Sequence, residues 1–386
     1  MANDNLYLDI HVIQTLPPSC VNRDDTGSPK TAFYGGVNRA RVSSQSWKNA
    51  IREMFKLSVT DNNEKSMSEA RQDMASSSSK SRLGIRTKRI VFLLKKELEL
   101  LGSTDPEQDA MKVLKKAIPK SSKDEKKLLE MAEIPGCAEK TKEWMNSALF
   151  FISQQQLKGL AKLVMENPEY TKKEAASVLR QAGTLDMHLF GRMVAQNAEL
   201  NIDACAQVAH AISTHAVINE YDFFTAIDDA AEKSHAGASM LSTIEYNSST
   251  LYRYATVAVH QLQKQLGEDT PDALRIFVDA FIRSMPTGRQ NSFANRTLPS
   301  AVLITLRRDQ PINFVGAFEK PIAATDEGYV SASERALVKH AQNTYKTWLP
   351  EPELSIVVGE GLGSLASPTA LQDACDKVRS YVLENL

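Results

Sequence analysis

Apolar and polar residues alternate over positions 6–12, which is the period-two pattern of a half-buried β-strand. Pro17-Pro18 should end this strand, because proline has no backbone N–H to donate. The pattern then changes: from Trp47 to Phe55 the apolar residues recur three and four positions apart. This spacing predicts a helix over 43–56 that turns one face to a core. Ser43 is a favourable first residue because its hydroxyl can accept a free N–H of the first turn.

The rest of the pattern predicts a mixed α+β chain. Helical spacing is expected over 90–100, 106–118, 123–133, 138–152, 154–165, 171–182, 271–285, 332–345 and 368–384. Strands are expected over 203–215, 251–259 and 301–306. Residues 57–184 therefore form a predicted helical insertion between sheet elements. Residues 216–249 leave the sheet between two strands, with a small-residue tip at 237–239, and are predicted to form a β-hairpin arm.

Composition limits the partners and the location of the chain. Hydrophobic residues make up 42% of the 386 residues, as in globular proteins. The net charge is −1, so any nucleic-acid surface must be a local basic patch offset by acids elsewhere. The four cysteines form no CxxC pair and predict reduced thiols. With no signal-peptide pattern over 1–15 and no apolar stretch long enough for a membrane span, we expect a cytoplasmic protein without membrane contact.

The segment from Asn38 to Lys56 holds the clearest candidate binding site. Its cations surround the start of the predicted helix, and no acid stands between Arg39 and Arg52. A helix start offers free N–H groups and a positive dipole end, so this arrangement suits a phosphate. The alternative is the solvated face of an ordinary amphipathic helix. The predicted phosphate-binding side chains are Arg39, Arg41, Ser43, Gln45, Ser46, Lys48 and Arg52.

Other patterns give little support to catalysis. His210, expected to face the core of a strand, and His215 have no cysteine nearby and no HExxH spacing, so packed histidines are favoured over metal ligands. The acid pairs Asp24-Asp25 and Asp228-Asp229 could hold magnesium, but adjacent side chains of an extended chain point apart. No GxxxxGK, GxSxG or glycine-rich dinucleotide turn is present. We predict no catalytic residue, no metal and no cofactor.

Several stretches together resemble a known family. Near the amino terminus these are SCVNRDD (19–25), FYGG (33–36) and RARVSSQSWK (39–48). Later stretches, in order, are DMHLFGRM (186–193), AHAISTH (209–215), DFFTAIDD (222–229), EYNSSTLYRYA (245–255) and GAFEKP (316–321). The set resembles the CasC family, the backbone subunit of type I-E CRISPR Cascade complexes, within the RAMP superfamily. The resemblance is weakest over 57–184.

The resemblance implies an α+β fold with an RNA-recognition-motif-like (ferredoxin-like) palm. The palm would comprise 1–56, 185–215 and 250–386, with helical fingers at 57–184 and a β-hairpin thumb at 216–249. Several copies would polymerise head to tail along CRISPR RNA, hold its spacer for pairing with target DNA, and assemble with other Cascade subunits. Such a protein would not be an enzyme. The alternatives are a metal-dependent CRISPR endoribonuclease of the same superfamily and an RNA chaperone without fixed stoichiometry.

The resemblance also implies how individual residues contact the RNA. The residue matching Met193 lies against guide bases and wedges beside them, next to Arg192. Leu241 matches an arm residue that inserts at a kink of the RNA, and Phe224 and Thr225 would line the same gap.

Arg23 and Lys30, in the loop that precedes the basic segment, complete the predicted RNA-binding set. Relatives tend to carry more basic residues where this chain has Val37, Asn38 and Asn49. We therefore expect the same binding mode with a different number of phosphate contacts.

Overall fold

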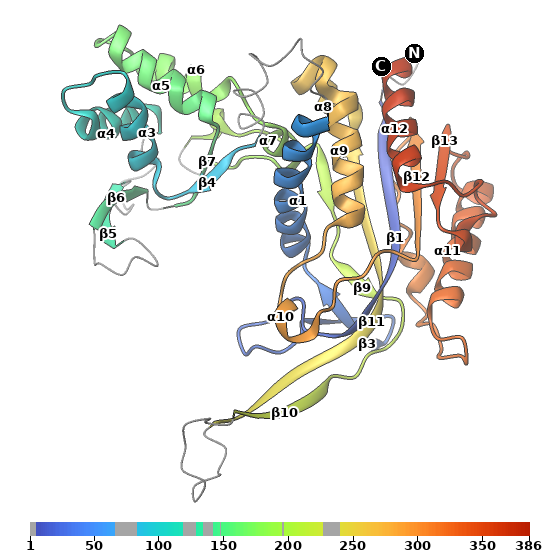
Figure 1. The fold of residues 1–386 in the computed structure, drawn as a ribbon. Coiled ribbons are helices and arrows are strands. Elements are labelled where there is room, and N and C mark those ends of the chain that lie inside the picture. The colour runs from blue at the N-terminus through green and yellow to red at the C-terminus, as the bar shows by residue number, and fades with distance from the viewer. Residues whose placement is uncertain are drawn as a thin grey trace, which may run out of the picture. The chain divides into compact units, whose positions relative to one another are not determined.

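The computed structural model describes residues 5–65, 83–118, 129–133, 142–146, 148–194, 197–226 and 240–386. The chain divides into two compact units. Unit 1 comprises Met1–Phe55 and Ala206–Leu386, and unit 2 comprises Lys56–Cys205 (Figure 1). Residues 185–205, which the sequence analysis assigned to the palm, group with unit 2. Side-chain hydrogen bonds tie them to it, because the Arg192 guanidinium donates to Leu179 O at 2.7 Å and to Phe151 O at 3.3 Å, and Gly84 N donates to Asp186 Oδ1 at 2.9 Å.

Unit 1 is built on an antiparallel sheet with the strand order β13-β12-β1-β11-β9-β3-β2. Two further strands, β8 and β10, pair with β11 outside this path. The bounds are β1 Tyr7–Ser19, β2 Thr31–Tyr34, β3 Val37–Val42, β8 Ala206–Val208, β9 Ala211–Ser213, β10 Glu220–Ala226, β11 Met240–Ala258, β12 Ala301–Arg307 and β13 Leu354–Val358. The strand predicted over 203–215 is thus broken into β8 and β9.

Strand β1 forms where the pattern predicted it, but the predicted half-burial and the predicted end are both wrong. Asp9 and His11 are 1% and 0% exposed, so both faces of the strand are buried. Leu8, Ile10 and Val12 are fully buried and pair with β11. The strand continues through Pro17-Pro18 to Ser19, because the register shifts between Leu16 and Ser19. At such an irregularity the missing proline N–H costs no ladder hydrogen bond, and prolines are tolerated there.

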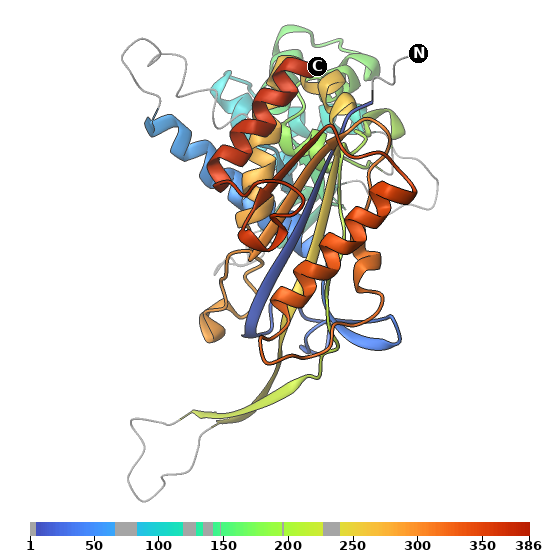
Figure 2. The ribbon, with the colours of Figure 1, turned by 90° about the vertical axis from the view of Figure 1, so that its right-hand side faces the viewer.

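Helices cover both faces of this sheet. The core on one face includes residues of β1, β11 and β12 together with Leu337 and Ala341 of α11. Helix α9 lies on the opposite face (Figures 1 and 2). The helices of unit 1 are α1 Ser44–Lys65, which continues into unit 2, α8 Val259–Leu266, α9 Thr270–Arg283, α10 Gln290–Phe293, α11 Val330–Thr347 and α12 Leu371–Asn385. Short 3₁₀ turns lie at η3 Gly267–Asp269, η4 Phe314–Phe318 and η5 Glu360–Leu362.

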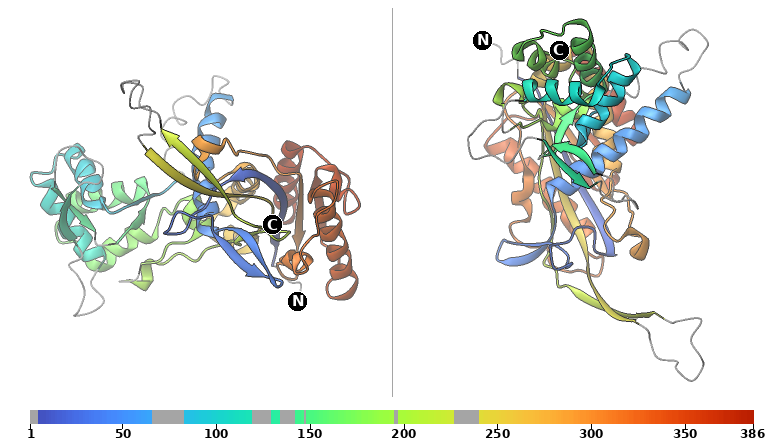
Figure 3. Two further views of the ribbon diagram at one scale, coloured as in Figure 1. Left: turned by 90° about the horizontal axis from the view of Figure 1, so that it is seen from below. Right: turned by 90° about the vertical axis from the view of Figure 1, so that its left-hand side faces the viewer.

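Unit 2 gathers its helices around their own core (Figure 3). They are α3 Ile90–Leu100, α4 Pro106–Ala117, α5 Gln154–Glu166, α6 Lys172–Arg180 and α7 Leu185–Phe190, with a 3₁₀ turn η1 Ala198–Leu200. Capping boxes at Ser153 and Thr171 begin α5 and α6 where the sequence pattern placed them.

Two predicted helices of unit 2 are wrong. Within 123–133 the described residues form β5 Leu129–Glu133, which pairs with β6 Lys142–Asn146. Within 138–152 the chain forms β6 and then β7 Phe150–Ile152, which pairs with β4 Ile85–Thr87. A short apolar run such as Phe150–Ile152 fits a buried strand and a buried helix equally well. Its distant partner β4 decides the outcome.

The predicted arm contains a β-hairpin. Strands β10 and β11 pair antiparallel from Glu220↔Tyr246 to Ala226↔Met240. The paired part projects away from the sheet of unit 1 (Figures 1 and 2). The predicted tip, 237–239, and Asp228-Asp229 lie outside the described residues.

Candidate nucleic-acid interface

The start of α1 is built by contacts that the sequence pattern partly predicted. Ser43 Oγ accepts the Ser46 N–H at 3.3 Å, so Ser43 caps the helix as expected. Ser43 N donates to Asn22 Oδ1 at 2.8 Å, which ties the helix start to the 22–30 loop. Ser43 is 6% exposed, and its hydroxyl oxygen accepts a helix N–H, so its part in the site is to form the helix start. Behind the cap, Trp47 packs beneath the Arg253 guanidinium at 3.8 Å.

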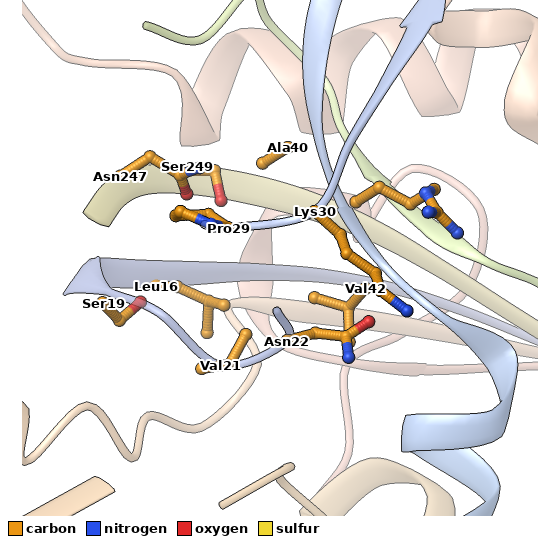
Figure 4. Close-up of a pocket in the computed structure, with 11 residues that line it drawn as sticks. Leu16, Ser19, Val21, Asn22, Pro29, Lys30, Ala40, Val42, Asn247 and Ser249 are labelled. Atoms are coloured by element: carbon orange, nitrogen blue, oxygen red, sulfur yellow. The ribbon is translucent and has the colours of Figure 1, made fainter. Parts of the chain in front are cut away.

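A basic cluster surrounds this helix start. Arg41 N donates to Lys30 O at 2.9 Å and Lys30 N donates to Asn22 O at 2.8 Å, so the 22–30 loop and β3 are held side by side. Figure 4 shows Asn22 and Lys30 in the small pocket between these segments and β11. Both side chains point to the same side of the pocket.

His210 lies in this cluster rather than in the core. Its Nδ1 accepts the Ser44 N–H at 3.2 Å and stands 3.5 Å from Arg41 Nη1. The prediction that His210 faces the core is wrong, because the break between β8 and β9 turns it outward. Partial burial, and then the charges of Arg41 and Lys30, lower the pKa of His210. A neutral imidazole therefore accepts a helix N–H inside a positively charged surface.

The remaining predicted side chains of this segment reach solvent. Arg23 and Gln45 are exposed, and Lys30, Arg41, Ser46, Lys48 and Arg52 are partly exposed. All of them belong to the loop, strand and helix that meet at Ser43. The structure therefore places seven of the predicted unit 1 residues on segments that the hydrogen bonds above join together: Arg23, Lys30, Arg41, Gln45, Ser46, Lys48 and Arg52.

Arg39 is a correction to the predicted set. Its side chain is fully buried. The guanidinium donates to Tyr34 O at 3.1 Å, Ser213 O at 2.9 Å, and the carbonyls of Phe318 and Glu319 at 2.8 and 3.3 Å. These bonds join the β2–β3 hairpin to β9 and to the end of η4. Arg39 is therefore a structural residue, with its guanidinium buried among backbone carbonyls.

Asp24 organises its own loop. Asp24 Oδ1 accepts from Thr26 N at 3.0 Å, Thr26 Oγ1 at 2.7 Å and Ser28 N at 3.0 Å. These hydrogen bonds lower the pKa of Asp24, and the bond from Thr26 Oγ1 has the largest effect. Among the described residues, no group of three His, Cys, Asp or Glu could hold a metal ion.

His215 is buried and packed. Its ring stacks on Tyr329 at 3.6 Å between ring centroids, and its Nε2 accepts the Thr250 N–H at 3.1 Å. His215 is therefore packed and hydrogen-bonded, as predicted.

Residues 286–296 join the 22–30 loop although sequence reasoning gave them no role. A Cβ added to Gly288 would lie 2.2 Å from Val21 O, so the two backbones touch. Arg289 and Ala294 adopt positive φ angles of 46° and 45°, which non-glycine residues rarely do. In the sequence, the Gly288-Arg289 pair was the signal that could have pointed to this segment, because it places a cation in a loop.

In unit 2, the neighbouring residues Arg192 and Met193 differ in burial: Arg192 is buried and Met193 is exposed. The Arg192 guanidinium is buried and donates to Leu200 O at 2.9 Å and Leu179 O at 2.7 Å. Its predicted RNA contact is wrong for the same reason as that of Arg39. Met193 is 84% exposed, so it contributes little to the core and is available to a ligand.

The predicted arm residues lie in the paired hairpin. Phe224 is partly exposed and Thr225 is exposed. Leu241 pairs with Thr225, and its side chain lies outside the described residues. Two further aromatic residues of the arm, Tyr221 and Phe223, are 69% and 64% exposed. Sequence reasoning missed both, although such exposed aromatic side chains are suited to stacking on bases.

A known protein family matches nearly the whole chain. Residues 8–376 match the family described as CT1975-like protein. The chain belongs to this CasC-type family. The match confirms the resemblance drawn from the short stretches, and it extends across residues 57–184, where those stretches gave least support.

Solved structures agree with the family assignment. A chain of a "CRISPR RNA-guided surveillance complex, pre-nicking" is 29% identical, with a TM-score of 0.79 over 97% of this chain and 100% of that one. A chain of a "CRISPR RNA-guided surveillance complex" is 27% identical, with a TM-score of 0.68 over 97% and 99%. A search of curated proteins finds no match. Among the described residues, no helix is long and apolar enough to cross a membrane.

Proposed function

We propose that this protein is a CRISPR RNA-binding backbone subunit of a Cascade-type surveillance complex. The observation that carries the proposal is the likeness of nearly the whole chain to chains of two CRISPR RNA-guided surveillance complexes. The positive charge of the basic cluster at the start of α1 also supports this proposal. Its cations suit a phosphate backbone and carry no base preference.

In this proposal the sheet of unit 1 is the RNA-recognition-motif-like palm, unit 2 supplies the fingers, and the β10–β11 hairpin is the thumb. Arg23, Lys30, Arg41, Lys48 and Arg52 hold phosphates of the guide, while Met193 and the hairpin contact unstacked bases. The protein reads backbone and shape, and pairing between guide and target DNA reads sequence. Copies of the chain contact each other head to tail, and other Cascade subunits bind at the ends or along this array.

We further propose that the protein itself is not a nuclease and acts in the cytoplasm. Asp24, one of the acids considered for magnesium, uses a carboxylate oxygen to accept three hydrogen bonds within its own turn. That arrangement favours a structural role over metal-dependent cleavage. The runner-up, a metal-dependent endoribonuclease, predicts magnesium-dependent loss of the guide in the purified protein.

Guide length provides the decisive experiment. The complex is assembled on guides whose spacers differ in length, and the copy number is measured by native mass spectrometry. A backbone subunit adds whole copies as the spacer lengthens, because each copy covers a fixed length of RNA. A copy number that stays constant, or RNA bound without fixed stoichiometry, would refute the proposal and favour the chaperone alternative.

A further inference from the structure

The arm leaves the sheet of unit 1 at a gap in the strand pairing (Figures 1 and 2). Strand β11 pairs with β9 at Leu251↔Ser213, and it next pairs with β10 at Glu220↔Tyr246. The six residues 214–219 therefore stand opposite the four residues 247–250. Segments of unequal length cannot form a regular antiparallel ladder. The direction of the arm therefore depends on the contacts that bridge this gap.

His215 bridges the gap with both of its ring nitrogens. Its Nε2 accepts the Thr250 N–H at 3.1 Å, on the strand by which the arm returns. Its Nδ1 lies 2.8 Å from Ala216 O, on the segment by which the arm leaves. A neutral imidazole donates from one nitrogen and accepts at the other, so these two contacts together require the tautomer with the proton on Nδ1. We call this pair of contacts the His215 clasp.

The imidazole is held in place by other parts of unit 1. It is 5% exposed and stacks on Tyr329, with ring centroids 3.6 Å apart and an angle of 8° between the planes. Ser213 Oγ donates to His215 O at 2.6 Å, and the buried Arg39 guanidinium donates to Ser213 O at 2.9 Å. The His215 clasp therefore ties both ends of the arm to a ring that the sheet fixes.

Two other contacts brace the base of the arm. Asn247 Nδ2 donates to Asn219 Oδ1 at 3.0 Å, and Val217 N donates to Asn38 O at 3.0 Å. Neither of these contacts contains a titratable group. A change of pH therefore separates the contribution of His215 from theirs.

We propose that His215 is a positioning residue, which holds the arm in the direction in which it reaches the RNA. That use of the arm rests on the proposed function, whereas the clasp belongs to the RNA-free protein. The clasp needs the neutral ring, because a protonated Nε2 would turn a second donor toward the Thr250 N–H.

The surroundings of His215 favour this neutral ring. Burial has the largest effect and lowers the pKa of His215. The hydrogen bond to Ala216 O raises this pKa, and the charge of Arg39 on β3 lowers it. The phenol of Tyr329 also faces the ring. The clasp is therefore closed at pH 7.5 and weakens as the pH falls below the ordinary histidine pKa of 6.5, which the ring regains when the clasp opens.

Hydrogen exchange at the Thr250 amide measures the clasp in the RNA-free protein. Rates are determined at pH 7.5 and pH 5.5 and corrected for the intrinsic pH dependence of exchange, with the amides of β1 as the reference for global opening. Because the opened ring takes up a proton, the fraction of molecules with an open clasp should rise by up to about tenfold at pH 5.5. Equal corrected rates at both pH values would overturn the proposal.

Matched variants separate the hydrogen bonds of His215 from its packing. In His215→Gln an amide oxygen can still accept the Thr250 N–H, so the amide should stay protected and its exchange should lose the pH dependence. In His215→Phe a ring still packs on Tyr329 but accepts no hydrogen bond, so exchange should be fast at both pH values. His260→Gln is the control, because His260 contacts Leu6 at the end of β11 remote from the arm. It should retain the pH dependence of the wild type.

Nuclease protection of the guide RNA then tests the use of the clasp. The complex is assembled at pH 7.5 on a guide, and protection should repeat at the length of RNA that each copy covers. His215→Phe should retain the guide but lose this repeat, and His215→Gln should restore it. At pH 5.5 the repeat should fade in the wild type and persist in His215→Gln, a comparison that also accounts for titration of His210 and that decides the question if His215→Phe does not fold.

The outcomes distinguish this proposal from the proposed function. If folded His215→Phe retains both the guide and the repeat, the other contacts set the direction of the arm, and the positioning role is wrong while the proposed function stands. If the wild type retains no guide at pH 7.5, the proposed function is wrong, and the use assigned to the arm is wrong with it. The exchange measurement still reports the clasp in that case, because it needs no RNA.

Discussion

Arg39 and Arg41 make the sharpest test of how this surface is built. Both stand on β3 two residues apart, and a sequence pattern treats them as equivalent phosphate ligands. In the structure Arg39 is fully buried and bonded to four backbone carbonyls, whereas Arg41 is partly exposed beside His210. We predict that Arg39→Ala destabilises unit 1 and that Arg41→Ala weakens RNA binding at nearly unchanged stability.

The expected magnitude follows from the contacts. A hydrogen bond to a charged group contributes about 1.5–3 kcal/mol, and buried carbonyls left without a donor add a penalty of similar size. Desolvation of the Arg39 charge offsets part of this, so we expect a loss of about 3–5 kcal/mol. For a domain of this size each kcal/mol lowers Tm by roughly 2–4 °C, which corresponds to a decrease of about 6–20 °C. Arg41 donates through Nε to Thr31 O at 3.1 Å, and truncation there should cost about 1 kcal/mol.

Two assays together measure this prediction. Denaturant unfolding of the RNA-free variants gives the stability change, and fluorescence anisotropy with a single-stranded guide gives the affinity. Hydrogen exchange provides the local readout, because Arg39→Ala should speed exchange in the β2–β3 hairpin and at 314–319, the segments that the guanidinium joins.

The result that would refute this reasoning is a reversal of the two effects. If Arg39→Ala unfolds like the wild type and loses RNA affinity with a reduced salt slope, then Arg39 reaches phosphate and its buried carbonyl contacts are not what holds the hairpin. A further variant, Arg39→Lys, should be little more stable than Arg39→Ala, because one ammonium group cannot replace a planar guanidinium that donates to four carbonyls.

Four further predictions concern binding, catalysis and stability. Replacing Lys48 and Arg52 by Ala should reduce the slope of log K against log salt by about 0.7 per lost phosphate contact, and an unchanged slope would support the ordinary surface-helix interpretation. Met193→Ala should change stability by less than about 0.5 kcal/mol, as at other exposed sites, whereas a melt showing the roughly 2–5 kcal/mol loss of a buried methionine would place this side chain in the core. Purified protein incubated with labelled guide RNA and magnesium should leave the RNA intact, and cleavage that disappears in Asp24→Ala would favour the nuclease alternative. Burial, and then the charges of Arg307 and His340, lower the pKa of His11 to about 3. Neutral His11 therefore contributes its full stability above the ordinary pKa near 6.5, and this contribution falls by about 2 kcal/mol at pH 5. In His11→Asn the loss of stability between pH 7.5 and pH 5 should be smaller by that amount, and an equal loss in both proteins would contradict the prediction.

Local pattern predicted those parts of the fold that a few neighbouring residues decide. The helix over Ile90–Leu100 has the predicted bounds, and Ser43 caps α1 through its own third neighbour, Ser46. These features depend on helical periodicity and on a hydroxyl within reach of a free N–H, both of which are present in a short stretch of chain. The basic run after Asn38 belongs to β3 and the start of α1, which the structure joins to the 22–30 loop.

Tertiary structure decided which residues of that region face solvent. Arg39 and Arg41 share one face of β3, so periodicity cannot separate them. The end of η4, about 280 residues later in the chain, covers Arg39 and supplies carbonyls to its guanidinium. The same holds for Arg192, buried by Leu179 and Leu200, and for β7, which became a strand because β4 offers it a partner. Burial and strand pairing depend on segments distant in sequence, and only the folded chain brings those segments together.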